Sequence, residues 1–462
     1  MGRADQLYAR LPVWAQHLAV TTYGVYWNRV RFGRGYARFV DGYRARDRFT
    51  SAQWTAYQTS KLRELVEVAI THVPYYRSTW TARQKAAARA ADLAEIPLLE
   101  KEPMRADARA FVREDATARP LVFHTSGSTG TPIASMWTWL EYRDALALRE
   151  VRSANWAGVS FTRPRATFSG RIVEPDPHST GPYYRFNLVE RQAYLSAFHL
   201  RKETAQQYLD ALRRHSIEWI TGYAVSAYLL ARFVVEQGLR VEAPLKAIVT
   251  TSEKVTPGMR ATMEQAFGCP VFEEYSTVEN AVFASDCEHH RLHVSPDAGI
   301  VELIRPDGSP AAPGEPGEVV ATCLIRSYQP MIRFRLGDMA MWDPEPCPCG
   351  RAMPVVKEVL GRVEDVIIGA DGREMVRFHG IFTDQPHIRE GQIVQETLTR
   401  IRVRVVPAPG YGAADTANVI ARMRQRLGNG TEIVVETVPH LERTKAGKFQ
   451  PVISLLAKRN AI

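Results

Sequence analysis

The stretch His124-Thr-Ser-Gly-Ser-Thr-Gly-Thr-Pro132 follows Arg119-Pro-Leu-Val-Phe123, whose apolar end is typical of a short β-strand. Gly127 and Gly130 let the backbone turn tightly and approach a ligand closely. Four residues offer hydroxyl groups that, with backbone N–H groups, can surround a chain of phosphates: Thr125, Ser126, Ser128 and Thr129. Because no Gly-Lys-Ser/Thr follows, the loop is not a P-loop. A phosphate-binding loop and an ordinary Gly/Ser turn both fit the stretch taken alone.

The size and composition of the chain indicate a globular protein of several domains. Its 462 residues are too many for one hydrophobic core, so we expect two or three domains. Hydrophobic residues make up 45% and charged residues 24%, which is ordinary for a soluble protein. Even the apolar stretch 11–27 is interrupted by polar residues, and no signal-peptide cleavage site follows it. We therefore expect no integral membrane segment and a cytoplasmic location.

The chain is basic, with a formal net charge of +9. Its arginines are spread along the sequence, which favours solubility and attraction of anionic substrates over nucleic-acid binding, so we expect no nucleic-acid partner. The segment Arg29–Arg48 is the densest basic patch. It fits contact with an acidic partner or a membrane surface, and it also fits a solvated helical face. The odd number of cysteines argues against a disulfide framework.

The pattern along the chain predicts an α/β protein. Residues 1–118 are mostly helical, with Thr50 or Ser51 as the N-cap of a helix. Strand-like and helical stretches alternate over residues 166–274, including a helix at Pro257–Phe267, which predicts a mostly parallel sheet. Residues 299–342 carry short strands and turns, typical of a β-rich subdomain. The last hundred or so residues return to mixed strands and a helix, so we expect a small α+β domain there.

Five motifs occur in order at characteristic separations: Thr125-Ser-Gly-Ser-Thr-Gly130, Tyr275-Ser-Thr-Val-Glu279, Arg335-Leu-Gly-Asp338, Gly361-Arg-Val-Glu-Asp365 and Arg443-Thr-Lys-Ala-Gly-Lys448. Together they resemble the acyl-adenylate-forming enzymes. Three further stretches resemble the phenylacetate–CoA ligase-like branch: Val73-Pro-Tyr-Tyr76, Thr250-Thr-Ser-Glu253 and Cys347-Pro-Cys-Gly350. The resemblance implies a large N-terminal adenylation domain (1–362) and a small mobile C-terminal domain (363–462), with the hinge at Glu364.

The resemblance also implies site residues. It places the ATP β- and γ-phosphates on the 125–130 loop and Mg²⁺ on Glu279, a hard oxygen ligand. Asp338 would accept from the ribose hydroxyls, Arg362 would give a second ribose or phosphate contact, and Lys448 would bridge the acid and the α-phosphate. The remaining residues that it places around the nucleotide are Ser252, Glu253, Glu274, Tyr275 and Ser276.

The motifs depart from the family pattern at four positions, one of which is the hinge, where Glu364 replaces the usual Asp. Ile133 stands where many members have Lys, so the loop lacks a fixed cation and phosphate charge must be met elsewhere, with Arg333 or Arg335 as candidates. Ser276 and Val278 replace the usual Gly and Thr, and the hydroxyl missing at Val278 removes one α-phosphate contact.

A separate pattern combines Cys287-Glu-His-His-Arg-Leu-His293 with the two cysteines of Cys347-Pro-Cys349. Cysteines on a tight turn with a distant Cys and His suit a closed tetrahedral Zn²⁺ site, and members of the branch carry such a site. We expect Cys287, His293, Cys347 and Cys349 as ligands, with His289 and His290 as alternates. Free thiols beside a surface histidine cluster are the other interpretation.

The expected activity is ATP-dependent activation of a carboxylic acid to an acyl-adenylate, then transfer to coenzyme A. Aromatic residues at 168, 183, 184, 186 and 223 favour an aryl or unsaturated acid, although core packing explains them equally well. An amine acceptor and a non-catalytic nucleotide-binding relative remain alternatives. The sequence leaves the acid, the acceptor and the choice between monomer and homodimer open.

Overall fold

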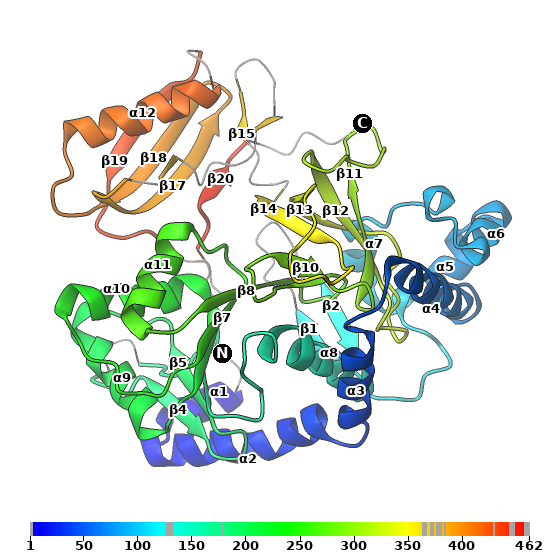
Figure 1. The fold of residues 1–462 in the computed structure, drawn as a ribbon, viewed down its shortest axis with the longest axis horizontal. Coiled ribbons are helices and arrows are strands. Elements are labelled where there is room, and N and C mark those ends of the chain that lie inside the picture. The colour runs from blue at the N-terminus through cyan, green and yellow to red at the C-terminus, as the bar shows by residue number, and fades with distance from the viewer. Residues whose placement is uncertain are drawn as a thin grey trace.

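The computed structural model describes residues 3–124, 133–176, 179–362, 367–369, 374–375, 381–382, 385–427, 430–442 and 449–456. Figure 1 shows two parts: a large body that holds most of the helices and the main sheet, and a small domain above it that carries α12. Among the described residues, no helix combines the length and apolar character needed to cross a bilayer.

The first part of the chain is helical, as predicted. Its helices are α1 (Arg3–Arg10), α2 (Val13–Phe32), α3 (Tyr36–Arg46), α4 (Ser51–His72), α5 (Pro74–Thr79), α6 (Ala82–Ala90) and α7 (Lys101–Ala106). Thr50 caps α4 through a capping box: its hydroxyl accepts from the Gln53 N–H, and the Gln53 side chain accepts from the Thr50 N–H. This confirms one of the two predicted caps. Pro74 ends α4 and also starts α5, because proline fits the first helical position.

The main sheet has twelve strands in the order β11-β12-β13-β14-β10-β9-β8-β7-β6-β3-β5-β4. Its strands are β3 (Arg165–Ser169), β4 (Tyr184–Asn187), β5 (Gln192–Ser196), β6 (Trp219–Tyr223), β7 (Ala247–Thr251), β8 (Val271–Ser276), β9 (Phe283–Asp286), β10 (Leu292–Val294), β11 (Gly299–Ile304), β12 (Pro316–Cys323), β13 (Phe334–Trp342) and β14 (Val355–Arg362). The strands β5, β3, β6, β7 and β8 pair in parallel, and the pairs on both flanks are antiparallel. The α/β class is therefore confirmed with a mixed sheet, whose parallel part is central.

Helices cover both faces of the parallel part: α8 (Trp139–Arg149), α9 (Ala205–Arg214), α10 (Ala224–Gln237) and α11 (Pro257–Phe267). Neighbouring strand residues belong to different cores, because side chains alternate across a strand. Ile220 packs with residues of α9, α10 and α11, whereas Trp219 packs with Leu146 of α8. This sandwich keeps the ends of the strands, where the motifs lie, at one edge of the layer.

The β-rich region expected at 299–342 contains β11, β12 and β13. A separate hairpin pairs β1 (Leu121–His124) with β2 (Ala134–Trp137). The upper domain contains β17 (Ile388–Thr397), β18 (Arg400–Pro407), β19 (Glu432–Thr437), β20 (Val452–Ser454) and α12 (Ala413–Leu427), with the short pair β15 (Ile367–Ile368) and β16 (Glu374–Met375). Its sheet order is β19-β18-β17-β20, and its apolar core is separate from those below.

A buried carboxyl between α3 and α8 gives the fold a pH dependence. Tyr43 donates to Asp144 Oδ1 at 2.8 Å, but burial dominates and raises the pKa of Asp144 to about 6. Because the folded protein holds this proton more tightly, stability is greatest below the unfolded pKa and falls as pH rises through about 6.

We expect Asp144→Asn to remove this loss of stability at higher pH. As pH rises from about 4.5 to 7.5, the free energy of unfolding of the variant should increase by about 2 kcal/mol relative to that of wild type. Urea titration at each pH measures this difference. Parallel pH profiles for the two proteins would contradict the assignment.

Candidate functional site

Three of the predicted motifs meet at the end of β8. The Tyr275 hydroxyl donates to Asp338 Oδ2 at 2.7 Å, which joins β8 to β13. Asp338 lies opposite Arg362 in the β13–β14 register. The side chain of Arg362 lies outside the described residues, so only its backbone is placed. The structure thus brings into contact Tyr275 and Asp338, two residues that the resemblance placed around the nucleotide.

Glu279 lies in the turn that follows β8. It is buried, and Arg326 donates to its carbonyl oxygen at 2.6 Å and to the Met136 carbonyl at 2.6 Å. Arg326 also stacks on Trp137, with its guanidinium 4.1 Å from the ring centroid. This buried arginine therefore ties the Glu279 turn to β2, and burial lowers its pKa. The motifs do not point to Arg326, because its role depends on contacts between distant segments.

Glu274 and Arg149 form an ion pair beneath the same turn. Arg149 Nη2 lies 2.6 Å from Glu274 Oε2, whose side chain is almost fully buried. Burial lowers the pKa of Arg149, but the carboxylate of Glu274 outweighs it and the net pKa is raised. The predicted nucleotide-site residue Glu274 is thus engaged by an arginine at the end of α8 that sequence reasoning missed.

A cavity of about 240 Å³ lies beside this turn. Residues of β1, β2, α8, the end of β8 and the β8–β9 turn line it: Phe123, Trp137, Tyr142, Ala145, Leu146, Arg149, Ser276, Thr277, Val278 and Asn280. Aromatic rings form one wall, with Phe123 and Tyr142 stacked at 5.5 Å. Such a wall suits a planar or apolar group.

The five aromatic residues considered for the acid are not among those that line this cavity. Phe168, Tyr183 and Tyr184 are buried in the core beneath α9, and Tyr183 stacks on His199. They are core residues, in line with the alternative interpretation. The cavity wall comes instead from Phe123, Trp137 and Tyr142, which sequence reasoning did not select.

Glu253 connects the two parts of the chain. Its carboxylate accepts from the Val225 N–H at 2.8 Å, at the start of α10, and from the Phe449 N–H at 3.3 Å. Ser252, beside it, has a left-handed φ of 71°. Phe449 directly follows Lys448 in the sequence, so Glu253 anchors the segment next to the expected catalytic lysine.

The 125–130 loop, Glu364 and Lys448 lie outside the described residues. The suggestion that Arg333 or Arg335 meets phosphate charge is not supported, because carboxylates already bind both guanidinium groups. Arg333 pairs with Glu302, and Arg335 pairs with Glu100 and Glu318.

Four predicted metal ligands come together between the β9–β10 hairpin and the loop before β14. One ligand atom from each of Cys287, His293, Cys347 and Cys349 lies within 4.8 Å of all the others. Cys287 and Cys347 Sγ atoms are 3.6 Å apart, and Cys349 Sγ is 3.3 Å from His293 Nε2. His293 Nδ1 lies 3.2 Å from the Met353 carbonyl oxygen, which leaves Nε2 free to face the thiols. Three sulfurs and one imidazole fit a tetrahedral metal ion.

Neither alternate histidine contributes a ring nitrogen to the cluster of described residues. His290 Nδ1 lies 3.1 Å from Arg260 Nη1 and its ring packs on Phe272. His289 contributes its backbone N–H to Cys287 Sγ. Of the three histidines, His293 therefore completes the cluster.

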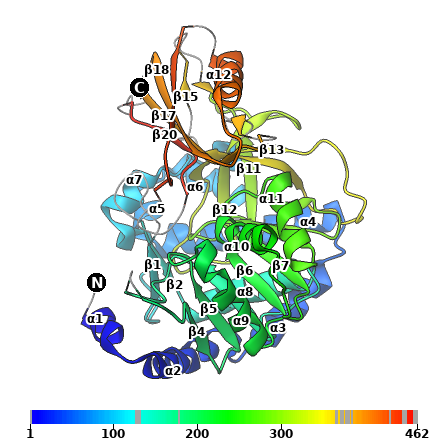
Figure 2. The same cartoon turned by 90° about the vertical axis from the view of Figure 1, so that its left-hand side faces the viewer.

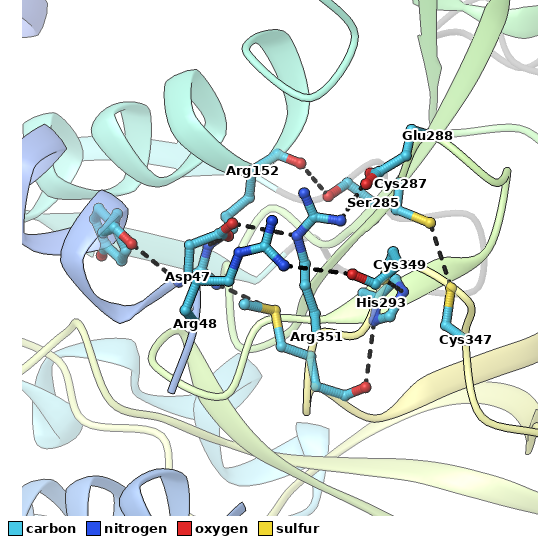
Figure 3. A network of polar contacts seen from close by, with 12 residues as sticks. Asp47, Arg48, Arg152, Ser285, Cys287, Glu288, His293, Cys347, Cys349 and Arg351 are labelled. Carbon is cyan, nitrogen blue, oxygen red and sulfur yellow. Dashed lines mark hydrogen bonds and ion pairs between the residues drawn. The ribbon is translucent and has the colours of Figure 1, made fainter. Parts of the chain in front are cut away.

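The surroundings of the cluster hold it in place (Figure 3). Arg351 pairs with Asp47, after α3, and with Glu288, beside Cys287. Burial raises the pKa of Cys287 to about 12 and lowers that of His293 to about 4. Burial also raises the pKa of Cys349, but hydrogen bonds from Arg351 outweigh it and the net pKa is lowered. A cation would supply the charge that buried thiolates need.

Comparison with known proteins gives relatives over most of the chain. The CapK C-terminal domain family matches residues 369–455. Protein CapK of Staphylococcus aureus is 23% identical over 373 residues, which cover 78% of this chain and 79% of the relative. A phenylacetate-coenzyme A ligase of Aromatoleum evansii is 26% identical over 336 residues, which cover 68% and 71%. The chain is a relative of the adenylate-forming enzymes.

The fold supports the same grouping. The structure of 2-hydroxyisobutyryl-CoA ligase with an acyl-AMP, in its postadenylation state, superposes with a TM-score of 0.69 at 20% identity, covering 88% of this chain and 91% of that chain. Both the α/β body and the small α+β domain therefore follow the adenylate-forming fold. The resemblance drawn from the five motifs is confirmed.

Proposed function

We propose that this protein activates a carboxylic acid with Mg-ATP to an acyl-adenylate, releases pyrophosphate, and passes the acyl group to coenzyme A. The bond between Tyr275 and Asp338, beside buried Glu279 and an aromatic cavity, carries the proposal. It connects the Tyr275 ring, which can border adenine, with the Asp338 carboxylate, which can accept hydrogen bonds from the ribose hydroxyls. The relatives, which include coenzyme A ligases, support the acceptor.

Each of these residues would have a distinct role in the proposed reaction. The acid lies against the aromatic wall, with its carboxylate toward the β8–β9 turn. Asp338 and Tyr275 fix the nucleoside, so that the α-phosphorus meets the acid in line. Glu279 would hold Mg²⁺, and the bound ion would neutralise phosphate charge. Lys448 donates to the acid and α-phosphate, and the small domain moves about Glu364 before thioester formation.

We also propose that the cluster of three cysteines and His293 holds Zn²⁺ in a structural role. All four positions are filled by protein atoms, so no open position remains for a substrate. The ion would join the β9–β10 hairpin to the loop before β14.

Acid-dependent ATP–pyrophosphate exchange tests the adenylation step. In a panel of aryl, unsaturated and fatty acids, at least one acid should support exchange. The absence of exchange with every acid would refute the proposal. Product analysis with coenzyme A against hydroxylamine and amines then identifies the acceptor. If amides are the only products, the second step is amide synthesis rather than transfer to coenzyme A.

Lys448→Ala should lower this exchange about 100-fold, because it removes a charged donor to the transition state. Lys445→Ala, a lysine of the same segment, should leave the rate within about twofold if only Lys448 acts. Undiminished exchange in Lys448→Ala would contradict the role assigned to that lysine.

A further inference from the structure

The outer face of α2 exposes large apolar side chains. Trp14 is 71% exposed, Leu18 59% and Tyr23 56%. Trp139 and Leu140, at the start of α8, extend the same surface, and the Tyr26 and Trp139 rings lie 5.4 Å apart. We call these six residues the α2 face: Trp14, Leu18, Tyr23, Tyr26, Trp139 and Leu140. A shallow hollow along α2, lined by Leu18, Tyr23 and Tyr26 among others, runs through it.

The opposite side of α2 is packed and holds the helix in place. Gly24 and Trp27 are buried, and a side chain at Gly24 would collide with Asn187 after β4. His17 Nδ1 accepts from the Phe186 N–H at 2.9 Å. The helix therefore cannot turn its apolar face inward, and the exposure of the α2 face is a fixed property of the fold.

The surroundings of the α2 face are basic. The sequence contains no Asp or Glu between Gln6 and Val40. Exposed arginines of that segment lie at both ends of α2 and at the start of α3: Arg10, Arg29, Arg34 and Arg38. An apolar face with exposed Trp and Tyr, on a segment that carries arginines and no carboxylate, is typical of helices that lie in the plane of an anionic membrane.

The position of α2 leaves the rest of the molecule free. In Figures 1 and 2 α2 lies along the lower edge of the body, on the side opposite the domain that carries α12. A flat surface against this edge would not obstruct movement of that domain.

A run of aromatic rings leads from the α2 face to the cavity. Tyr26 contacts Trp27 at 5.6 Å, Trp27 contacts Tyr142 at 5.5 Å, and Tyr142 stacks on Phe123 in the cavity wall. The exposed face is thus continuous, through packed rings, with the cavity beside the β8–β9 turn.

A second copy of the chain is a poorer occupant. A two-fold contact would place the same arginines of both copies around one apolar patch. The segment 6–40 supplies no carboxylate to offset them, so like charges would oppose association. An anionic lipid surface matches both the apolar and the basic character.

We propose that the α2 face docks the protein on an anionic membrane surface, with Trp14, Leu18 and Tyr26 entering the headgroup region and the arginines facing lipid phosphates. This docking does not depend on the proposed adenylation, because it uses no residue assigned to that reaction.

Flotation of the full chain with lipid vesicles tests the proposal. Vesicles containing phosphatidylglycerol should bind at least about 10-fold more protein than vesicles of phosphatidylcholine alone, and added salt should weaken binding. Trp14→Glu with Leu18→Glu should lower binding about 10-fold or more. Arg29→Glu with Arg34→Glu should lower it roughly 20-fold, because each basic residue near an anionic leaflet contributes about fivefold.

Leu398→Glu is the matched control, because Leu398 is 45% exposed in the turn between β17 and β18, strands of the domain that lies opposite α2. It should bind vesicles like wild type, and all variants should keep the wild-type melting temperature. Equal binding to both vesicle types, or full binding by the Trp14/Leu18 variant, would overturn the proposal. The proposal would also be overturned if the wild type bound no vesicles and sedimented as a dimer that the Trp14/Leu18 substitutions dissociate. The α2 face would then join two copies of the chain.

Discussion

Replacing Glu279 with glutamine should reduce acid-dependent ATP–pyrophosphate exchange about 1000-fold. Glutamine keeps the size of the side chain and the buried turn, and the Arg326 bond to the backbone carbonyl remains. The substitution removes the negative charge that would hold Mg²⁺ near the phosphates. The loss should therefore appear in the rate of exchange rather than in the stability of the fold.

The measurement pairs exchange rates with melting temperatures. Glu64→Gln on α4, a similar substitution at a side chain that is 59% exposed, should change neither. Raising the Mg²⁺ concentration should restore part of the activity of Glu279→Gln if the residue acts through the metal. A Glu279→Gln enzyme with the wild-type rate would show that this carboxylate holds no ion in the reaction.

Local patterns in the sequence predicted local structure well. The helix expected at Pro257–Phe267 has those bounds in the structure, since Thr256 caps its start and Gly268 ends it with a left-handed φ of 65°. Thr50 likewise caps α4. These signals lie within a few residues of the elements that they define, so one sequence is enough to read them.

Features built from distant segments could not be read in this way. Arg326 reaches Glu279 and Met136, which are far away in sequence, and Arg149 reaches Glu274. The antiparallel flanks of the sheet depend on pairings such as β10 with β14. No short motif records such contacts, so the cavity wall, buried Arg326 and the Arg149–Glu274 ion pair emerged only from the fold.

The metal cluster lies between these cases. The sequence indicated three cysteines as ligands but left three histidines as candidates, because His289, His290 and His293 all lie close to Cys287 in the chain. The β9–β10 register settled the choice, since it sets His293 opposite Ser285 and turns it inward, whereas His290 lies in the connecting turn. A pattern of residues can propose ligands, but the strand pairing decides which side chain faces the others.

Replacing Cys347 and Cys349 together with serine should remove bound zinc and lower the melting temperature by about 5 °C or more. Purified wild-type protein should contain about one zinc per chain and the double variant less than about a tenth of that. Cys269→Ala, at a buried thiol outside the cluster, should keep its zinc. His293→Ala should lose it, whereas His289→Ala and His290→Ala should not.

The size of the destabilisation follows from what the ion connects. Cys287 and Cys347 are 60 residues apart in sequence, so one ion closes a long loop, which restricts the unfolded chain most. Without it, three sulfurs and His293 remain close together with only weak hydrogen bonds between them. A chelator that lowers the melting temperature of wild type but not of the double variant would tie the effect to the metal. Wild-type protein that is metal-free and equally stable would show that the cluster is a set of packed thiols.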